Sequence, residues 1–208
     1  MNLRKLFEEQ VGTLVSKGYP EQAGWTEAVF RRRLAPLRQH VENLKSDTCD
    51  YGKGRLPFVI VITRDLVPVD VAMSIVQRQG KSGHVAMEPV RPEDFEPILK
   101  VPTGGVYLLV GIDRGEESLN VRPEDALKMI RKKRRSPLTI EEDIALVTHH
   151  PDFLRKNHCF SLLASRRSDQ RVPAIWIDGA KRPKLGWCWD RNPHTWLGSA
   201  SCRRRIGV

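Results

Sequence analysis

The chain has 208 residues, of which 40% are hydrophobic and 29% charged, so it holds enough apolar material for one core or two small ones. Its 35 Lys and Arg residues outnumber 25 Asp and Glu residues, and the net charge of +10 predicts non-specific attraction to polyanions. No apolar run approaches the roughly 18 to 20 residues of a membrane span, and Glu8 and Glu9 stand where a signal peptide would be apolar. These features argue against membrane and exported proteins, and we expect a soluble, cytoplasmic one.

Residues 1–45 are predicted to form a helical arm. Apolar residues recur at steps of three and four over 3–15 and again over 30–44, a spacing that places them on one face of a helix. Pro36 interrupts the second stretch and removes a backbone donor, so we expect a kink or a new helix there. A loop over 46–56 leads into the body, residues 46–208, which is predicted to be one compact domain with the arm packed on it or on another subunit.

The body is predicted to belong to the α+β class because it mixes strand and helix patterns. Continuous apolar runs over 58–62 and 106–112 are typical of strands buried on both faces. Closer to the C-terminus, strand-like segments are separated by short polar turns, which predicts an antiparallel meander. Its expected strands are 159–165, 172–178 and 185–189.

Helices are expected between these strands. The spacing of apolar residues predicts one helix over 68–79, whereas 89–102 contains four prolines and is expected to be irregular. Pro123 suits the first turn of a further helix. Thr139 and Glu142 have the spacing of a capping box, and the helix that they begin is expected to end or kink at Pro151.

The densest basic run of the chain is residues 131–135. The helix expected after Pro123 ends there, and cations are favourable at the negative end of the helix dipole. Contact with a polyanion is the alternative, because residues 101–208 hold 20 basic and 12 acidic side chains (+8) against 15 and 13 (+2) in residues 1–100. We favour the helix-end explanation.

Tryptophan clusters near the C-terminus. Four of the five tryptophans lie there among cations: Trp176, Trp187, Trp189 and Trp196 with Arg182, Lys184, Arg191 and His194. Because side chains alternate along a strand, Trp187 and Trp189 are expected to share one face while Cys188 points to the other. Aromatic faces beside cations suit a flat or anionic ligand, or a single nucleic-acid strand. The alternative is that the indoles are core anchors of a small sheet.

Cysteine and histidine lie near each other in sequence at two places. A turn predicted at Asn192 separates Cys188 from His194, and His158 directly precedes Cys159. A nucleophilic cysteine needs a base or cation that lowers its pKa, so either pair is a candidate catalytic site. Ordinary reduced thiols are the alternative, because the four cysteines form no Cys-x-x-Cys pair and fit no zinc motif.

The sequence predicts neither a metal site nor a phosphate-binding loop. The adjacent His149 and His150 would point about 100° apart on a helix, so one of them is expected to cap the last carbonyls instead of sharing a metal. Residues 80–82 have the tail of a P-loop, but Ile75 stands where its first glycine belongs. The cofactor is therefore left open.

An arginine and an aspartate follow each of the two buried strands. Arg64 and Asp65 come after the first, and Asp113 and Arg114 after the second. Ligands of open α/β sheets bind outside the carboxyl ends of the strands, so two parallel strands would bring both pairs to one crevice. Ion pairing and turn capping are the alternative.

Several segments carry a resemblance to a known family. They are 57–68, 121–126, 137–149, 156–160 and, most specifically, 172–201, which contains Leu-Gly-Trp-Cys-Trp and Asn-Pro-His-Thr-Trp-Leu-Gly. In these the chain resembles an uncharacterised actinobacterial family known as a domain of unknown function. The resemblance implies a bacterial cytosolic protein with one domain and supplies no substrate. The basic run 131–135 and the tail 203–205 depart from the family's pattern.

The sequence is compatible with three functions. The favoured one is binding of a small anionic or aromatic ligand, or of a protein partner, by the tryptophan-rich surface or the Arg–Asp crevice. An enzyme using Cys188 or Cys159 with a histidine is the alternative, and nucleic-acid binding through the basic second half is the second alternative. The expected ligand-binding residues are Arg64, Asp65, Asp113, Arg114, Trp187, Trp189, Asn192, His194 and Trp196.

Overall fold

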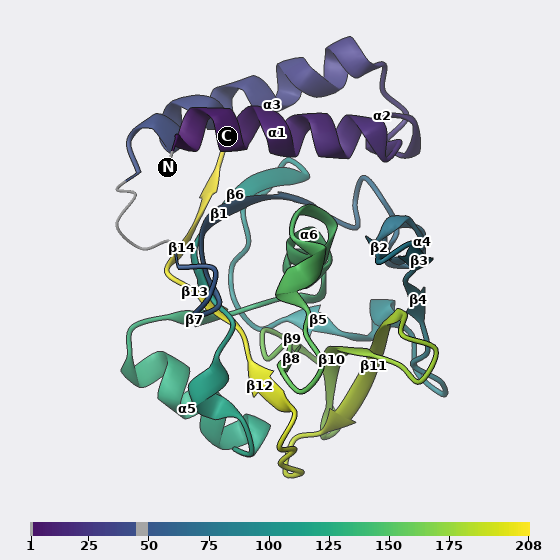
Figure 1. Ribbon diagram of the computed structural model, residues 1–208, viewed down its shortest axis with the longest axis vertical. Helices are drawn as coiled ribbons and strands as arrows, with labels where there is room; N and C mark the ends of the chain where they lie inside the picture. Colours follow the sequence, from purple (N-terminus) through teal and green to yellow (C-terminus); the bar gives the residue numbers. More distant parts are fainter. Residues whose placement is uncertain (1, 45–49) are drawn as a thin grey trace.

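The computed structural model describes residues 2–44 and 50–208, and it has the predicted α+β architecture (Figure 1). The helices are α1 (Leu3–Ser16), α2 (Tyr19–Gln22), α3 (Glu27–Glu42), α4 (Val69–Ile75), α5 (Pro123–Lys132) and α6 (Ile140–His149). Short 3-10 turns lie at Pro92–Asp94, Glu116–Ser118 and Pro151–Phe153. Residues 45–49, which include Cys49 and the start of the expected loop, lie outside the described residues.

One sheet contains the two strands that the sequence predicts to be buried. Its members are β1 (Arg55–Ile62), β6 (Val106–Asp113), β7 (Ser136–Pro137), β13 (Ser201–Cys202) and β14 (Arg204–Gly207). β6 pairs with β1 on one side and with β13 and β14 on the other, and each pairing is antiparallel. β14, which the sequence did not predict, pairs the basic tail with the central strand β6.

The other large sheet contains the meander. Its members are β4 (His84–Val85), β8 (Cys159–Ser161), β10 (Arg171–Ile177), β11 (Pro183–Trp189) and β12 (Leu197–Ser199). β8, β10 and β11 are antiparallel, as predicted, and β12 and β4 extend the sheet at its two edges by parallel pairing. Two small ladders complete the strands: β2 (Gln77–Arg78) with β3 (Lys81–Ser82), and β5 (Glu96–Pro97) with β9 (Ser165–Arg166). Because Gln77–Arg78 joins a ladder, α4 ends at Ile75 and the predicted helix over 68–79 is too long.

The N-terminal helices lie across the top of the molecule in Figure 1. α3 continues through Pro36, so the predicted new helix there is wrong. Pro36 is exposed, and the apolar face around it, including Leu34 and Leu37, stays buried. That face belongs to the same buried cluster as β1 and β6, which shows that the helices of the arm pack on the body.

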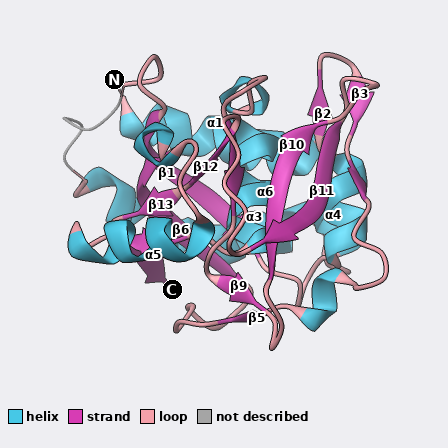
Figure 2. Cartoon of the chain, turned by 90° about the horizontal axis from the view of Figure 1, so that it is seen from below, coloured by secondary structure: helices cyan, strands magenta, loops and turns pink. Residues whose placement is uncertain are grey.

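Helix α6 lies between the two large sheets (Figure 2). Thr139 caps it, and the predicted capping box with Glu142 is present. All of its residues except His149 are buried. Across residues 2–44 and 50–208, no helix is both long and apolar enough to cross a bilayer.

Candidate functional site

The predicted crevice between the two Arg–Asp pairs does not form. β1 and β6 are antiparallel neighbours, with Arg55 opposite Asp113 and Ile62 opposite Val106. Arg64 therefore lies just beyond one end of the strand pair, and Asp113 lies at the opposite end. The expectation of one shared crevice is wrong because it required the strands to be parallel.

The two arginines of these pairs are held by groups within the protein. Arg64 forms an ion pair with Glu141 and donates to the carbonyl oxygen of Pro92 at 3.2 Å. Arg114 is only 1% exposed, and it donates to the carbonyl oxygen of Phe153 at 3.0 Å. These contacts join separate segments of the fold, while Nη2 of Arg64 and Nε of Arg114 are buried without a hydrogen-bond partner among the described residues.

The two aspartates cap turns or pair with a neighbouring cation. Asp65 accepts a hydrogen bond from the hydroxyl of Thr63 at 3.3 Å. Asp113 accepts from the backbone N–H of Gly115 at 2.9 Å and lies 3.3 Å from Nε of Arg55. The alternative weighed for these pairs, ion pairing and turn capping, describes what they do.

Trp187 and Trp189 lie on one face of β11, as predicted, with Cys188 on the other. Their ring centroids are 5.0 Å apart, and the guanidinium carbon of Arg171 lies 4.6 Å and 5.0 Å from them. The indole nitrogen of Trp187 donates to the carbonyl oxygen of Met87 at 2.8 Å. Arg171 thus covers ring surface that the sequence analysis assigned to a ligand.

Trp176 and Trp196 form a separate group with His194. The two indoles are 6.1 Å apart, and the imidazole of His194 lies 5.0 Å from Trp196. Beside them is a hollow of about 220 Å³, which Cys159 also lines. Asn192 is exposed in the preceding turn, where its backbone N–H donates to Trp189. The tryptophans therefore do not form one continuous surface.

The cysteines lack the environment of a nucleophile. Burial raises the pKa of Cys188 and of Cys159 to about 11, the opposite of what a reactive thiolate requires. Burial also lowers the pKa of His194, and Nδ1 of His158 faces Glu116 at 3.4 Å. These thiols are protonated at neutral pH, so the proposed Cys–His pairs are not activated. The described part of the chain also contains no cluster of three or more His, Cys, Asp or Glu side chains suited to a metal ion.

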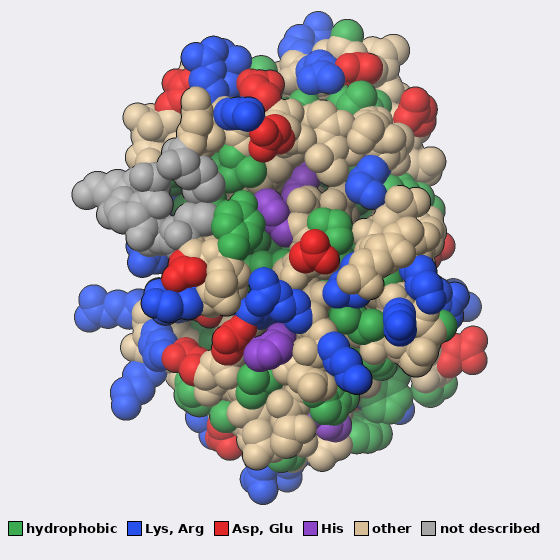
Figure 3. All heavy atoms as spheres, viewed as in Figure 1, with side chains coloured by type: hydrophobic (Ala, Val, Ile, Leu, Met, Phe, Trp, Pro, Cys, Tyr) green, Lys and Arg blue, Asp and Glu red, His purple; other side chains and the backbone are tan. Residues whose placement is uncertain are grey.

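A different hollow, at the C-terminal end of α6, has the features of a binding site. This histidine pocket has a volume of about 320 Å³ and is lined by residues 149–153 together with Tyr51 and Arg155. Histidine side chains are visible in the hollow at the centre of Figure 3. Its walls are largely aromatic, while the charged side chains of Asp152 and Arg155 are exposed.

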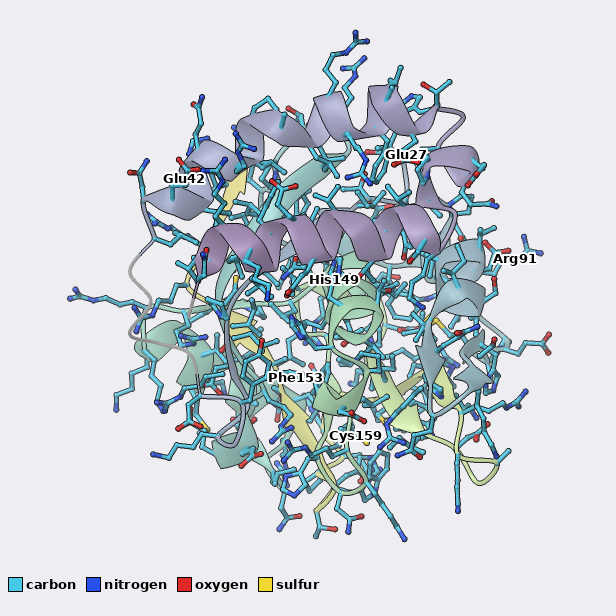
Figure 4. The ribbon with its side chains drawn as sticks, turned by 45° about the horizontal axis from the view of Figure 1, so that its top comes forward. Glu27, Glu42, Arg91, His149, Phe153 and Cys159 are labelled. Carbon is cyan, nitrogen blue, oxygen red and sulfur yellow. The ribbon has the colours of Figure 1, made fainter. Side chains whose placement is uncertain are left out.

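His149 presents a hydrogen-bond acceptor that has no partner. Its Nε2 lies 3.0 Å from the carbonyl oxygen of Ile60, which can only accept, so Nε2 carries the proton. Burial lowers the pKa of His149 to about 3, and the ring is neutral at physiological pH. The unprotonated Nδ1 is buried and has no hydrogen-bond partner among the described residues. Figure 4 shows His149 between α1 and α6.

His150 continues this wall of the pocket. Burial lowers its pKa to about 4, and its Nε2 is also buried without a hydrogen-bond partner in residues 2–44 and 50–208. Its ring packs edge-on against Tyr51 with centroids 5.6 Å apart, and lies 6.5 Å from that of His149. Two neutral imidazoles and two further aromatic rings, those of Tyr51 and Phe153, therefore surround one hollow.

The histidine pair has a different role from the predicted one. The sequence predicts that one of them caps the last carbonyls of the helix, whereas the side chain of His149 reaches Ile60 on β1. The sequence feature that could have indicated this pocket is a pair of adjacent histidines at the end of a helix whose last turns are otherwise mostly apolar. Tyr51 comes from a distant turn, so no local pattern could have joined it to them.

Comparison with known proteins places the chain in a family. A family model described as a family of unknown function (DUF5701) matches residues 13–208. No curated protein and no solved structure matches the chain. The resemblance inferred from the sequence motifs is thus confirmed at the level of the family, while the actinobacterial source stays a prediction. Since the match runs from within α1 to the last residue, this protein belongs to the family of unknown function DUF5701.

Proposed function

We propose that this protein binds a small planar molecule bearing N–H or O–H donors, and that the histidine pocket is the binding site. The observation that carries the proposal is the buried, unpaired Nδ1 of His149, a residue that lines that pocket. A buried polar atom without a partner costs about 1–3 kcal/mol, and a ligand that donates to it recovers this free energy.

The shape and chemistry of the pocket restrict the ligand. A volume of about 320 Å³ lies at the small end of the range for ligand sites, which suits a compact molecule. Tyr51 and the two imidazoles offer aromatic surface for a planar ring, whereas Phe153 is buried with Arg114 over its ring. Both imidazoles are neutral, so they attract donors rather than anions.

Binding is favoured over catalysis by the low basicity of the two imidazoles. A general base works best when its pKa is near the operating pH, and those of His149 and His150 are about 3 and about 4. Such rings accept a hydrogen bond but take up a proton poorly at neutral pH. Ligand binding thus stays the favoured function, at residues other than those that the sequence predicted.

Indole and 1-benzothiophene test the proposal, because they have nearly the same shape but differ in the N–H donor. We expect indole to bind at least fivefold more tightly. Binding is measured by the shifts of the ring-nitrogen signals in protein labelled with ¹⁵N at histidine and tryptophan. The His149→Gln variant, whose amide nitrogen replaces Nε2 toward Ile60, should lose most of that preference. His40→Gln, an exposed histidine on α3, is the matched control and should bind like the wild type.

Two results would contradict the proposal. If 1-benzothiophene bound as tightly as indole, the imidazole acceptors would not select the ligand. If neither compound moved the signals of His149 and His150, while the tryptophan signals of β11 responded, the aromatic site would lie on the tryptophan-rich sheet instead.

A further inference from the structure

A second hollow lies near the basic residues that the sequence analysis regarded as a helix end and a departing tail. This cationic pocket has a volume of about 320 Å³, and its charged walls are Arg55, Lys133, Arg135, Arg203, Asp113 and Glu117. In Figure 3, Lys and Arg side chains project along the left edge of the molecule, in the region of α5. The run 131–135 and the tail 203–205 thus each contribute side chains to one site.

Arg135 is fixed at the wall of the pocket. Its Nε donates to the hydroxyl of Ser201 at 2.8 Å, and one terminal nitrogen donates to the carbonyl oxygen of Gly111 at 2.7 Å. Burial lowers the pKa of Arg135, and the charges of Arg203 and Arg55 lower it further, although Asp113 opposes them. Arg55, Arg135 and Arg203 therefore line the same hollow, and the charges of the other two act on Arg135.

Arg203 reaches the pocket because of a glycine on the neighbouring strand. Gly111 has φ of +67°, and Arg203 stands opposite it between the β13 and β14 pairings with β6. A Cβ atom at position 111 would lie 2.8 Å from Cδ of Arg203, so the stem of that arginine runs across the space a side chain would fill. A glycine inside a strand often marks a place where another group approaches the backbone closely.

The charges of the pocket do not balance. Lys133 pairs with Glu117, and Arg55 with Asp113, whereas Arg135 is bonded to neutral groups. Arg203 has no carboxylate partner in the described part of the chain. Four cations and two carboxylates leave a net charge of +2.

We infer that the cationic pocket binds the dianionic phosphoryl group of a small molecule. A phosphate monoester carries a charge of about −1.5 to −2 at pH 7, which matches the net positive charge of the pocket. A guanidinium group can also donate two hydrogen bonds at once to two phosphate oxygens. A nucleic-acid strand offers singly charged phosphodiesters in a row. The cations here surround one hollow, and Asp113 and Glu117 stand on its walls, so a single dianion is the better match. This site is separate from the histidine pocket and does not depend on the ligand proposed there.

Calorimetric titration of the full chain with inorganic phosphate and with phenyl phosphate tests the inference. We expect both probes to bind, and Arg203→Gln to weaken binding about tenfold. Arg204→Gln is the matched control, because Arg204 is the next residue, is exposed, and loses the same charge without lining the pocket. It should change the affinity less than twofold.

The remaining outcomes each overturn the inference. Absence of phosphate binding to the wild type would remove the site. An equal loss in Arg203→Gln and Arg204→Gln would indicate general charge attraction instead of a pocket. Binding of a single-stranded oligonucleotide without terminal phosphates, together with no binding of phenyl phosphate, would assign these cations to nucleic acid. Failure of the indole experiment would leave this test unaffected, since it concerns other residues.

Discussion

Buried polar groups have partners at the first end of helix α6 and lack them at its last end. At its first turn, Glu141 pairs with Arg64, and Glu142 pairs with Arg205 while accepting from the hydroxyl of Tyr107. At its last turn, His149 and His150 each retain a buried nitrogen with no partner among the described residues. Buried polar groups are almost always paired, so the first end holds the fold together and the second end is where a ligand is expected.

Disrupting the paired end should lower the free energy of unfolding most. Arg205 donates to Oε2 of Glu142 and to the carbonyl oxygen of Pro137, both at 2.7 Å, and Glu142 is fully buried. Arg205→Met would leave that carboxylate without its cation, which costs about 3–5 kcal/mol at a buried pair. Urea unfolding followed by circular dichroism should show this loss in the free energy of unfolding.

The control for that change is the preceding residue. Arg204 is exposed on the same strand, and Arg204→Met removes the same charge from the surface. Its effect should stay within about 0.5 kcal/mol. Equal losses in the two variants would mean that the buried pair contributes nothing beyond the general charge of the tail.

Local signals predicted the paired end only in part. The capping box was predictable because Thr139 and Glu142 are three residues apart, and the spacing itself specifies the hydrogen bonds. The pair between Glu142 and Arg205 was not, because it depends on β14 returning to β6 from the far end of the chain. The strands β1 and β6 were likewise predictable as buried segments, but an apolar run contains no information on the direction of its neighbour.

The candidate site was predicted less well than the fold. Tryptophan enrichment drew attention to β11, yet Arg171 covers Trp187 and Trp189 within the protein itself. The histidine pocket combines adjacent histidines on α6 with Tyr51 from another segment. Composition reveals which side chains are abundant, whereas a binding site is defined by which of them the fold leaves without partners.

Asp143 lies on α6 between the paired and the unpaired end. Both of its carboxyl oxygens are buried with no hydrogen-bond partner in the described residues, and burial raises its pKa well above the usual value. The folded state is penalised once the pH exceeds about 3.8, where the unfolded carboxyl ionises. Asp143→Asn should therefore raise the free energy of unfolding at pH 7 by about 2 kcal/mol.

The pH dependence distinguishes this effect from a change in packing. The gain of Asp143→Asn should shrink as the pH falls toward 4, because the carboxyl is then protonated in both states. Asp70→Asn, at an exposed acid in the first turn of α4, is the matched control and should not stabilise the protein. A stabilisation that is the same at pH 4 and pH 7 would contradict the assignment to a buried carboxyl.

The unpaired end gives an effect that appears as a slope of the unfolding free energy against pH. The pKa values of His149 and His150 in the folded protein are about 3 and about 4, below the ordinary value of 6.5. Between pH 6.5 and 4 the unfolded chain therefore binds more protons than the folded one, and stability falls as the pH is lowered. Each histidine contributes about 1.4 kcal/mol per pH unit to this fall.

His149→Gln isolates one of these two contributions. Its amide nitrogen can still donate to the carbonyl oxygen of Ile60, but the side chain does not titrate, so the slope of unfolding free energy between pH 6 and 4.5 should decrease by about 1.4 kcal/mol per pH unit. His40→Gln, on the exposed face of α3, should keep the wild-type slope. An unchanged slope in His149→Gln would show that this imidazole is protonated in the folded state, and its Nδ1 would then be a donor, unable to accept the ligand's N–H.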